Sequence, residues 1–171
     1  MAPRRRPPVP DQESRLSDDH HESLRLWLRL LTCTMLIEHR VRTRLRERFA
    51  ISLPRFDLMA QLERNPQGLK MVELSRRLMV TGGNVTGITD QLVAEGLVER
   101  RAIPGDRRAF AVRLTAKGRR TFDAMAAAHE RWVIEMFAGM PRTERDRLHA
   151  LLGRVKELLR AQNSTHTEEA A

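Results

Sequence analysis

The sequence is poor in several residue types, and each shortage excludes a class of protein. Its 171 residues include one cysteine, no tyrosine, two tryptophans and five phenylalanines. A single cysteine rules out an intrachain disulfide and a cysteine-rich metal site, and it fits a reducing cytosol. No uncharged apolar run approaches the roughly 20 residues that cross a bilayer, and nothing resembles a secretory leader. We therefore expect a cytoplasmic protein without membrane span, metal or cofactor.

Positive charge, in contrast, is abundant. Lysine and arginine number 31 against 22 acidic residues, which gives a formal net charge of +9. Such an excess indicates a polyanionic partner, which could be DNA, RNA or an anionic membrane, although codon bias would give the same composition. Only three of these residues are lysines. Arginine's rigid fork pairs with phosphates and guanine edges better than a point charge does.

The first half of the chain predicts helices. Residues 1–17 are rich in arginine and proline and are expected to form a disordered basic arm. Apolar residues recur at helical spacing across residues 18–50, which predicts a long first helix. Ser52 and Pro54 begin a second helix, and the Asn-Pro-Gln-Gly sequence at 65–68 ends it.

A helix-turn-helix followed by a hairpin is expected next. Residues 69–78 predict a short third helix with Val72 and Leu74 facing inward, and Thr81 caps a fourth helix that stops at Gly96. The residues that follow change to a period of two, with a Pro-Gly-Asp-Arg turn between two strand-like segments. This order is that of a winged helix-turn-helix, in which the second short helix enters the major groove of DNA.

The fourth helix would be the one that contacts bases. Val85, Ile88 and Leu92 form its buried stripe. The positions left facing outward carry mostly small or hydrogen-bonding residues: Gly83, Asn84, Thr86, Gly87, Asp90 and Gln91. Each glycine costs up to about 1 kcal/mol in a helix, so the cluster of Gly82, Gly83 and Gly87 indicates close approach of the backbone to phosphates or base edges, or else a weak helix.

Three segments resemble the MarR family. They are Leu92–Arg100 (LVAEGLVER), Pro104–Arg108 (PGDRR) and Leu114–Gly118 (LTAKG), and the resemblance extends over roughly residues 24–159. It implies a homodimer clasped by the first and last helices, with Asp106 orienting the wing and Arg108 in the minor groove beside Arg107. Narrow minor grooves attract guanidinium groups, although a solvated turn would have the same composition.

The expected fold is therefore mainly α (α+β), a winged helix-turn-helix with long terminal dimerisation helices and a two-stranded β wing. A dimerisation and ligand helix covers 18–50, the DNA-binding domain 51–115, the C-terminal dimerisation helices 116–162 and a disordered tail 163–171. Thr81 caps the recognition helix, and Arg76 and Arg77, just before it, are candidates for phosphate contacts that position the protein on duplex DNA.

The first helix also suggests a ligand site. Arginines flank its apolar stripe on both edges, either as snorkelling stems or as a site for phosphates. Residues 26–33 and 53–57 resemble family members that respond to hydroxycinnamoyl-CoA thioesters, which implies a repressor of an aromatic-acid catabolic operon. The candidate ligand residues are Trp27, Cys33, Arg40, Arg44, Arg55, Met59, His129 and Trp132.

Other functions compete with this interpretation. A small phenolic acid or oxidation of Cys33 could release the DNA instead, but peroxide-responsive relatives pair their cysteine with tyrosines, so a small buried side chain is the alternative expectation for Cys33. A helical protein-interaction module that does not bind DNA is the competing class. The sequence contains no nucleophile with a base, paired carboxylates or phosphate loop that would indicate an enzyme.

Overall fold

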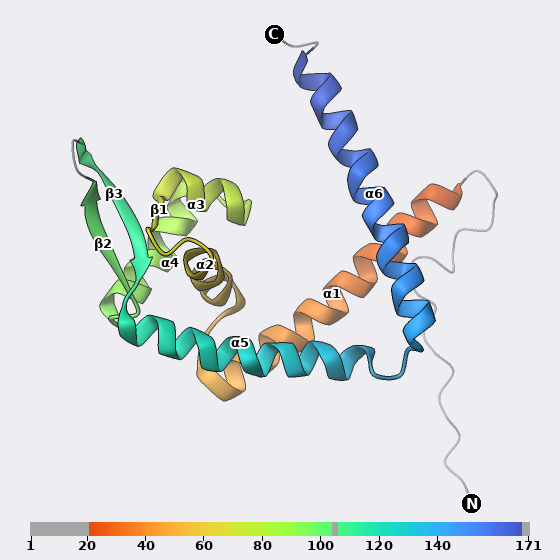
Figure 1. Ribbon diagram of the computed structural model, residues 1–171, viewed down its shortest axis with the longest axis horizontal. Coiled ribbons are helices and arrows are strands. Elements are labelled where there is room, and N and C mark those ends of the chain that lie inside the picture. Colours follow the sequence, from red (N-terminus) through yellow and green to blue (C-terminus); the bar gives the residue numbers. More distant parts are fainter. Residues whose placement is uncertain (1–20, 104–105, 169–171) are drawn as a thin grey trace, which may run out of the picture. The chain divides into compact units, whose positions relative to one another are not determined.

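The structure, a computed structural model, describes residues 21–103 and 106–168, with side chains described at 21–102 and 110–162 (Figure 1). The chain forms two compact units, of which the first ends at His129 and the second begins at Glu130, inside helix α5 (Ala116–Phe137). The predicted basic arm lies outside the described residues. Within the described ranges, no helix combines the length and the apolar character needed to cross a membrane.

Helix α1 (Glu22–Phe49) is the long first helix that the apolar spacing predicted. It ends where Ala50 adopts the left-handed conformation, with a φ of 52°, so that its N–H reaches the carbonyls of the last turn. Val41 and Leu45 are its buried residues. Towards the N-terminus the apolar residues of the same helix are exposed: Leu24, Leu26, Trp27, Leu31, Met35 and Leu36.

Helix α2 (Leu53–Glu63) begins as predicted, with Ser52 at its N-cap and Pro54 in its first turn. The segment 69–78, predicted as one helix, instead forms a short strand β1 (Leu69–Lys70) and helix α3 (Met71–Leu78). Strand β1 exists because Gly68, with a φ of +93°, turns the chain so that Leu69 and Lys70 pair with strand β3.

The burial predicted for α3 is half wrong. Leu74 is fully buried, whereas Val72 is 68% exposed. Residues two apart on a helix point to different sides, so Val72 and Leu74 cannot both face the core. Helix α4 (Gly82–Ala94) follows the prediction: the Thr81 side chain accepts a hydrogen bond from the Asn84 N–H at 3.4 Å, and Gly96, with a φ of +68°, ends the helical segment.

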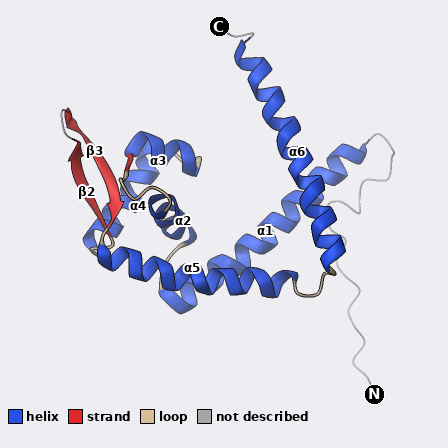
Figure 2. Ribbon diagram, viewed as in Figure 1, coloured by secondary structure: helices blue, strands red, loops and turns tan. Residues whose placement is uncertain are grey.

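The predicted wing is part of a three-stranded antiparallel sheet with the order β1-β3-β2 (Figure 2). Strands β2 (Val98–Ile103) and β3 (Asp106–Leu114) form the hairpin that the alternating pattern predicted. Their register places Val98 opposite Leu114, with an irregularity at Ala102 and Ile103. The two-stranded wing of the prediction lacked β1, because two residues are too few to show a period in the sequence.

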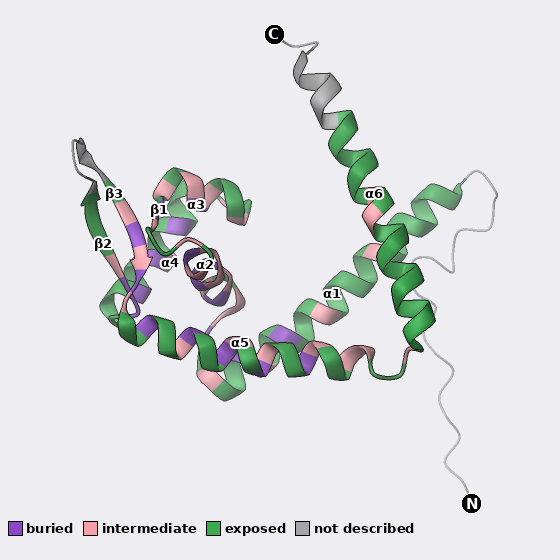
Figure 3. Ribbon diagram, viewed as in Figure 1, coloured by how far each residue is buried: buried purple, intermediate pink, exposed green. Residues whose placement is uncertain are grey.

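The core of the first unit joins these helices to the sheet, as the purple segments of Figure 3 show. Side chains with no exposed surface come from α1, α2, α3, α4, β3 and α5: Leu45, Leu58, Met59, Leu62, Leu74, Val85, Leu92, Val112 and Met125. Thr89 is the buried polar residue among the described side chains, and its hydroxyl donates to the Val85 carbonyl at 2.8 Å. The core thus fixes α4 against the rest of the unit.

Helix α6 (Arg142–Glu168) makes up most of the second unit. It continues past residue 162, where the sequence predicted the tail to begin, because the segment up to Glu168 contains neither proline nor glycine. Its apolar side chains are exposed in the single chain: Leu148, Leu151, Leu152, Leu158 and Leu159.

Candidate DNA interface

The outward face of helix α4 has the composition that the sequence predicted. All six residues placed outward are exposed: Gly83, Asn84, Thr86, Gly87, Asp90 and Gln91. A Cβ atom added at any of the three glycines, Gly82 included, would meet nothing within 4 Å, so none of them is required by packing inside the chain. The glycines therefore leave the backbone of this face accessible to a partner from outside.

Helix α3 supplies the neighbouring part of the surface. Arg76 and Arg77 are both exposed, as their predicted contact with phosphates requires. A groove of about 440 Å³ separates α3 from the start of α4, and the exposed Val72 lines it together with Arg76, Gly82 and Thr86. Apolar surface in this groove suits the methyl groups of thymine or the edge of a sugar.

Asp90 is exposed, but its carboxylate is already engaged. Oδ1 of Asp90 accepts a hydrogen bond from the Arg100 guanidinium at 2.5 Å, which ties the recognition helix to strand β2. Sequence analysis missed Arg100, since residues ten apart on different elements share no periodic pattern. Because Arg100 pairs with it, the Asp90 carboxylate presents less negative charge to DNA than an unpaired carboxylate would.

The hairpin carries a second charged cluster near its base. Glu99 on β2 accepts hydrogen bonds from Arg113 at 2.5 Å and from Arg101 at 3.0 Å. The hydrogen bond from Arg113 is the main reason that the pKa of Glu99 lies below its usual range. Asp106, Arg107 and Arg108 belong to β3 by their backbone, while their side chains lie outside the described residues.

The C-terminal end of α4 is anchored to two other helices. Glu95, its C-cap residue, pairs with Arg55 of α2, and the Lys117 ammonium of α5 donates to the Glu95 carbonyl at 2.8 Å. The Thr115 hydroxyl donates to the Gly96 carbonyl at 2.7 Å. These contacts were not predicted either, and they make the position of α4 depend on α2 and α5.

The predicted ligand residues differ in their exposure. Trp27, Cys33 and Arg40 are exposed; Arg44, Arg55 and His129 are half-buried; Met59 and Trp132 are buried. Met59 has no exposed surface and packs in the core of the first unit, and its role in a ligand site stays a prediction. The alternative expectation that Cys33 is buried is wrong, because it lies on the exposed part of α1.

Two titratable groups sit close to the core of the first unit. Burial, with a smaller contribution from Glu38, raises the pKa of Asp57 from 3.8 to about 6. Burial lowers the pKa of His129, whose ring lies 5.2 Å from that of Phe56. Across the described side chains, no group of three or more His, Cys, Asp or Glu residues is arranged to hold a metal ion.

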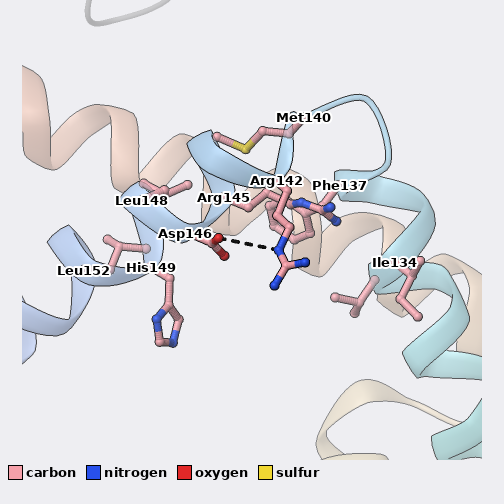
Figure 4. A pocket seen from close by; sticks show the side chains of 10 residues that line it. Ile134, Phe137, Met140, Arg142, Arg145, Asp146, Leu148, His149 and Leu152 are labelled. Carbon is pink, nitrogen blue, oxygen red and sulfur yellow. Dashed lines mark ion pairs between the residues drawn. The ribbon is translucent and has the colours of Figure 1, made fainter.

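The second unit contains a cavity of about 700 Å³ at the corner between α5 and α6 (Figure 4). Its apolar walls include Ile134, Phe137, Leu148 and Leu152, and Arg142 pairs there with Asp146 at 3.7 Å. Ile134 is 58% exposed and Leu152 41%. So much exposed apolar surface in one place is typical of a protein interface.

Comparison with known proteins gives a consistent result. The sequence profile of the MarR family matches residues 51–109, from the end of α1 to the wing. The crystal structure of a MarR family transcriptional regulator from Silicibacter pomeroyi is 33% identical, with a TM-score of 0.72, and the match covers 84% of this chain and 99% of that one. The likeness thus includes the terminal helices as well as the helix-turn-helix.

Two curated relatives are also transcriptional regulators. YkoM of Bacillus subtilis (strain 168) is 34% identical over 89 residues, which span 52% of this chain and 56% of YkoM. PecS of Dickeya dadantii (strain 3937) is 28% identical over 114 residues, which span 66% of this chain and 69% of PecS. Both are named HTH-type regulators, in agreement with the order of elements described above.

Proposed function

This chain belongs to the MarR family of transcriptional regulators, and we propose that it binds a pseudo-palindromic operator as a homodimer and represses transcription there. The observation that carries the proposal is the outward face of α4. Its small and hydrogen-bonding side chains are exposed, and its three glycines are not required by packing inside the chain. B-DNA's major groove, about 12 Å wide, admits a helix, and such a face lets its backbone come close to base edges.

The arginines around α4 fit two other roles that DNA binding needs, which are contact with phosphates and contact with the minor groove. Arg76 and Arg77 on α3 neutralise phosphates and set the register of the protein on the duplex. Arg108, near the turn of the hairpin, inserts into the adjacent minor groove, where a narrow groove concentrates negative potential. A protein that neutralises phosphates in this way binds DNA with a steep dependence on salt.

A second copy of the chain would cover the exposed apolar residues of the terminal helices. Leu151, Leu158 and Leu159 of α6 are 47%, 62% and 56% exposed in the single chain, more apolar surface than a lone helix of a monomer usually leaves to water. A two-fold dimer then places two recognition helices about one helical turn of DNA apart. Sedimentation at micromolar concentration tests this, and a monomer would contradict it.

The central experiment is a gel-shift titration with the operator. Arg108→Ala should weaken binding about tenfold and lower the dependence of log K on log salt by about one unit, since one phosphate or groove contact is lost. Arg4→Ala removes the same charge from the N-terminal arm and serves as the control. Exchanges at Asn84 or Thr86 should change the preference among operators by about 1–3 kcal/mol per altered base contact. Equal binding by Arg108→Ala and the parent would remove the wing from the mechanism.

For the effector, we propose an aromatic acyl-CoA thioester that controls an aromatic-acid catabolic operon. Trp27 and Arg40 support the proposal, because α1 exposes both an aromatic ring and a guanidinium group that phosphates could contact. Release of DNA requires the thioester to prefer a state with the wrong spacing of recognition helices. Titrating the protein–operator complex with p-coumarate and with its CoA thioester tests this: release by the free acid alone would refute it. Treating a Cys33→Ser variant with peroxide tests the alternative that oxidation of Cys33 releases the DNA.

A further inference from the structure

Val72 on α3 is an apolar residue that does not pack in the core. The sequence predicted that it faces inward, yet its side chain is 68% exposed. A single exposed apolar side chain is ordinary on a protein surface. Val72 differs because it lines the groove of about 440 Å³ between α3 and the start of α4. Its role therefore depends on what this groove can hold.

The groove lies between one face of each helix. Val72 and Arg76 are four residues apart on α3, so they are neighbours on the same face of that helix. Gly82 and Thr86 have the same spacing on α4 and form the part of the wall that this helix contributes. A Cβ atom added at Gly82 would meet nothing within 4 Å, so the groove is open at this point. Because Thr86 belongs to the outward face of α4, the groove adjoins the surface that would contact bases.

The hydroxyl groups that line the groove donate their hydrogen bonds inside the chain. Ser75 Oγ donates to the Val80 carbonyl at 2.6 Å, and Thr86 Oγ1 donates to the Gly82 carbonyl at 2.9 Å. A hydroxyl group has a single hydrogen to donate, so neither residue has a donor left for a ligand. What Thr86 still offers is its methyl group.

The rest of the lining suits one particular nucleotide. Met71 and Val72 are apolar, and Arg76 is the one charged residue among the described residues that line the groove. Such a surface fits a base edge that carries an alkyl group, with a phosphate on the guanidinium. Only thymine has a methyl group in the major groove. Adenine and cytosine would bring an amino group there, whose hydrogen bonds to water the apolar surface does not replace.

We propose that Val72 determines part of the operator sequence, by packing against the methyl group of one thymine in each half-site. The inference rests on the proposed function. Thr86 adds its own methyl group to this contact from α4, and Arg76 binds a phosphate of the same DNA strand. Both helices of the helix-turn-helix then read bases, rather than α4 alone. Contact with the edge of a sugar, the other apolar group of DNA, would not depend on the base.

The test compares thymidine with deoxyuridine, which lacks only the methyl group. Duplexes that the full chain binds are first selected from a random library, which supplies an operator. Each thymine of one half-site is then replaced in turn by uracil, and affinities are measured by gel shift at one salt concentration. We expect one thymine per half-site at which the replacement weakens binding about fourfold, the effect of losing one buried methyl group.

Val72→Ala shows whether this methyl group contacts Val72. The same replacement should then change the affinity hardly at all, so that the ratio of the two affinities falls from about four to about one. Val72 is exposed and alanine favours helices, so the variant should fold. Met79→Ala is the control, because it removes an exposed apolar side chain just after α3 that does not line the groove. It should keep the fourfold ratio.

Two results would overturn the inference and leave the proposed function intact, because the operator is still bound in both. One is a fourfold ratio that persists in Val72→Ala. The other is an operator in which no thymine depends on its methyl group, as contact with a sugar predicts. If the selection enriched no duplex at all, the proposed function would be refuted, and this inference with it.

Discussion

Replacing Gly118 with alanine adds one methyl group at a point where helix α5 touches the backbone of Leu97, the residue before strand β2. A Cβ atom at Gly118 would lie 1.8 Å from the carbonyl oxygen of Leu97 and 2.8 Å from its carbonyl carbon. Both obstructing atoms belong to the backbone, so no side-chain rotation can relieve the clash. The start of β2 and the first turn of α5 must therefore move apart.

The cost can be worked from the contacts that this movement breaks. The Leu97 carbonyl accepts a hydrogen bond from the Thr115 N–H at 3.1 Å, worth about 1 kcal/mol. Overpacking against buried neighbours adds about 1–3 kcal/mol, and the better helix propensity of alanine returns about 1. The expected loss is about 1–3 kcal/mol, a large share of the roughly 5–15 kcal/mol that a domain has.

Urea denaturation followed by circular dichroism measures the effect, at one fixed protein concentration because the stability of a dimer depends on concentration. Gly87→Ala is the matched control, since a Cβ atom there meets nothing within 4 Å. We expect Gly87→Ala to be as stable as the parent or up to about 1 kcal/mol more stable, while its operator affinity falls. If Gly118→Ala proved as stable as Gly87→Ala, the close approach of α5 to Leu97 would be refuted.

Three further predictions follow from single residues. Because the pKa of Asp57 is raised, the free energy of unfolding falls as pH rises from about 4 through 6. Asp57→Asn should therefore raise the free energy of unfolding by about 1 kcal/mol at pH 7.5 and leave it unchanged at pH 4. Urea titrations at both pH values check the sign. Arg100→Ala leaves the Asp90 carboxylate facing DNA and should lower operator affinity about fivefold, with recovery in the Arg100→Ala/Asp90→Asn double variant; no recovery in gel shifts would contradict the pairing. Met79 has a φ of +53° and is 94% exposed, so Met79→Gly should raise stability by up to about 1 kcal/mol in thermal melts, and a lower melting temperature would argue against strain there.

The elements that the sequence predicted correctly are those whose ends carry their own chemistry. Thr81 offers a hydroxyl for the first free N–H groups of α4, and Gly96 tolerates the left-handed conformation that follows the helix. The change from a helical period to a period of two then identified the hairpin before any contact was known. Local physics alone decides these features, so the sequence of this one chain was enough to predict them.

The features that sequence analysis missed depend on residues that only the fold brings together. Strand β1 forms because β3 offers it a free edge, and Arg100 meets Asp90 because β2 runs past α4. The ligand residues were chosen by type, and the structure then placed Met59 in the core and exposed Trp27. Long-range placement of this kind has no signature in spacing or composition, so the candidate ligand site was the least predictable part of the molecule.

The attachment of α4 is uneven along its length, and this has a consequence for regulation. The first turn is held mainly by the Thr81 cap and by Val85 in the core, and a Cβ atom added at its glycines would meet nothing within 4 Å. The other end is held through Glu95 by two cations from α2 and α5. A displacement of α2 or α5 therefore reaches α4 from the end farther from Asn84. The helix would move as a body, so a change of this kind alters the fit to every operator without exchanging the groups that contact the bases.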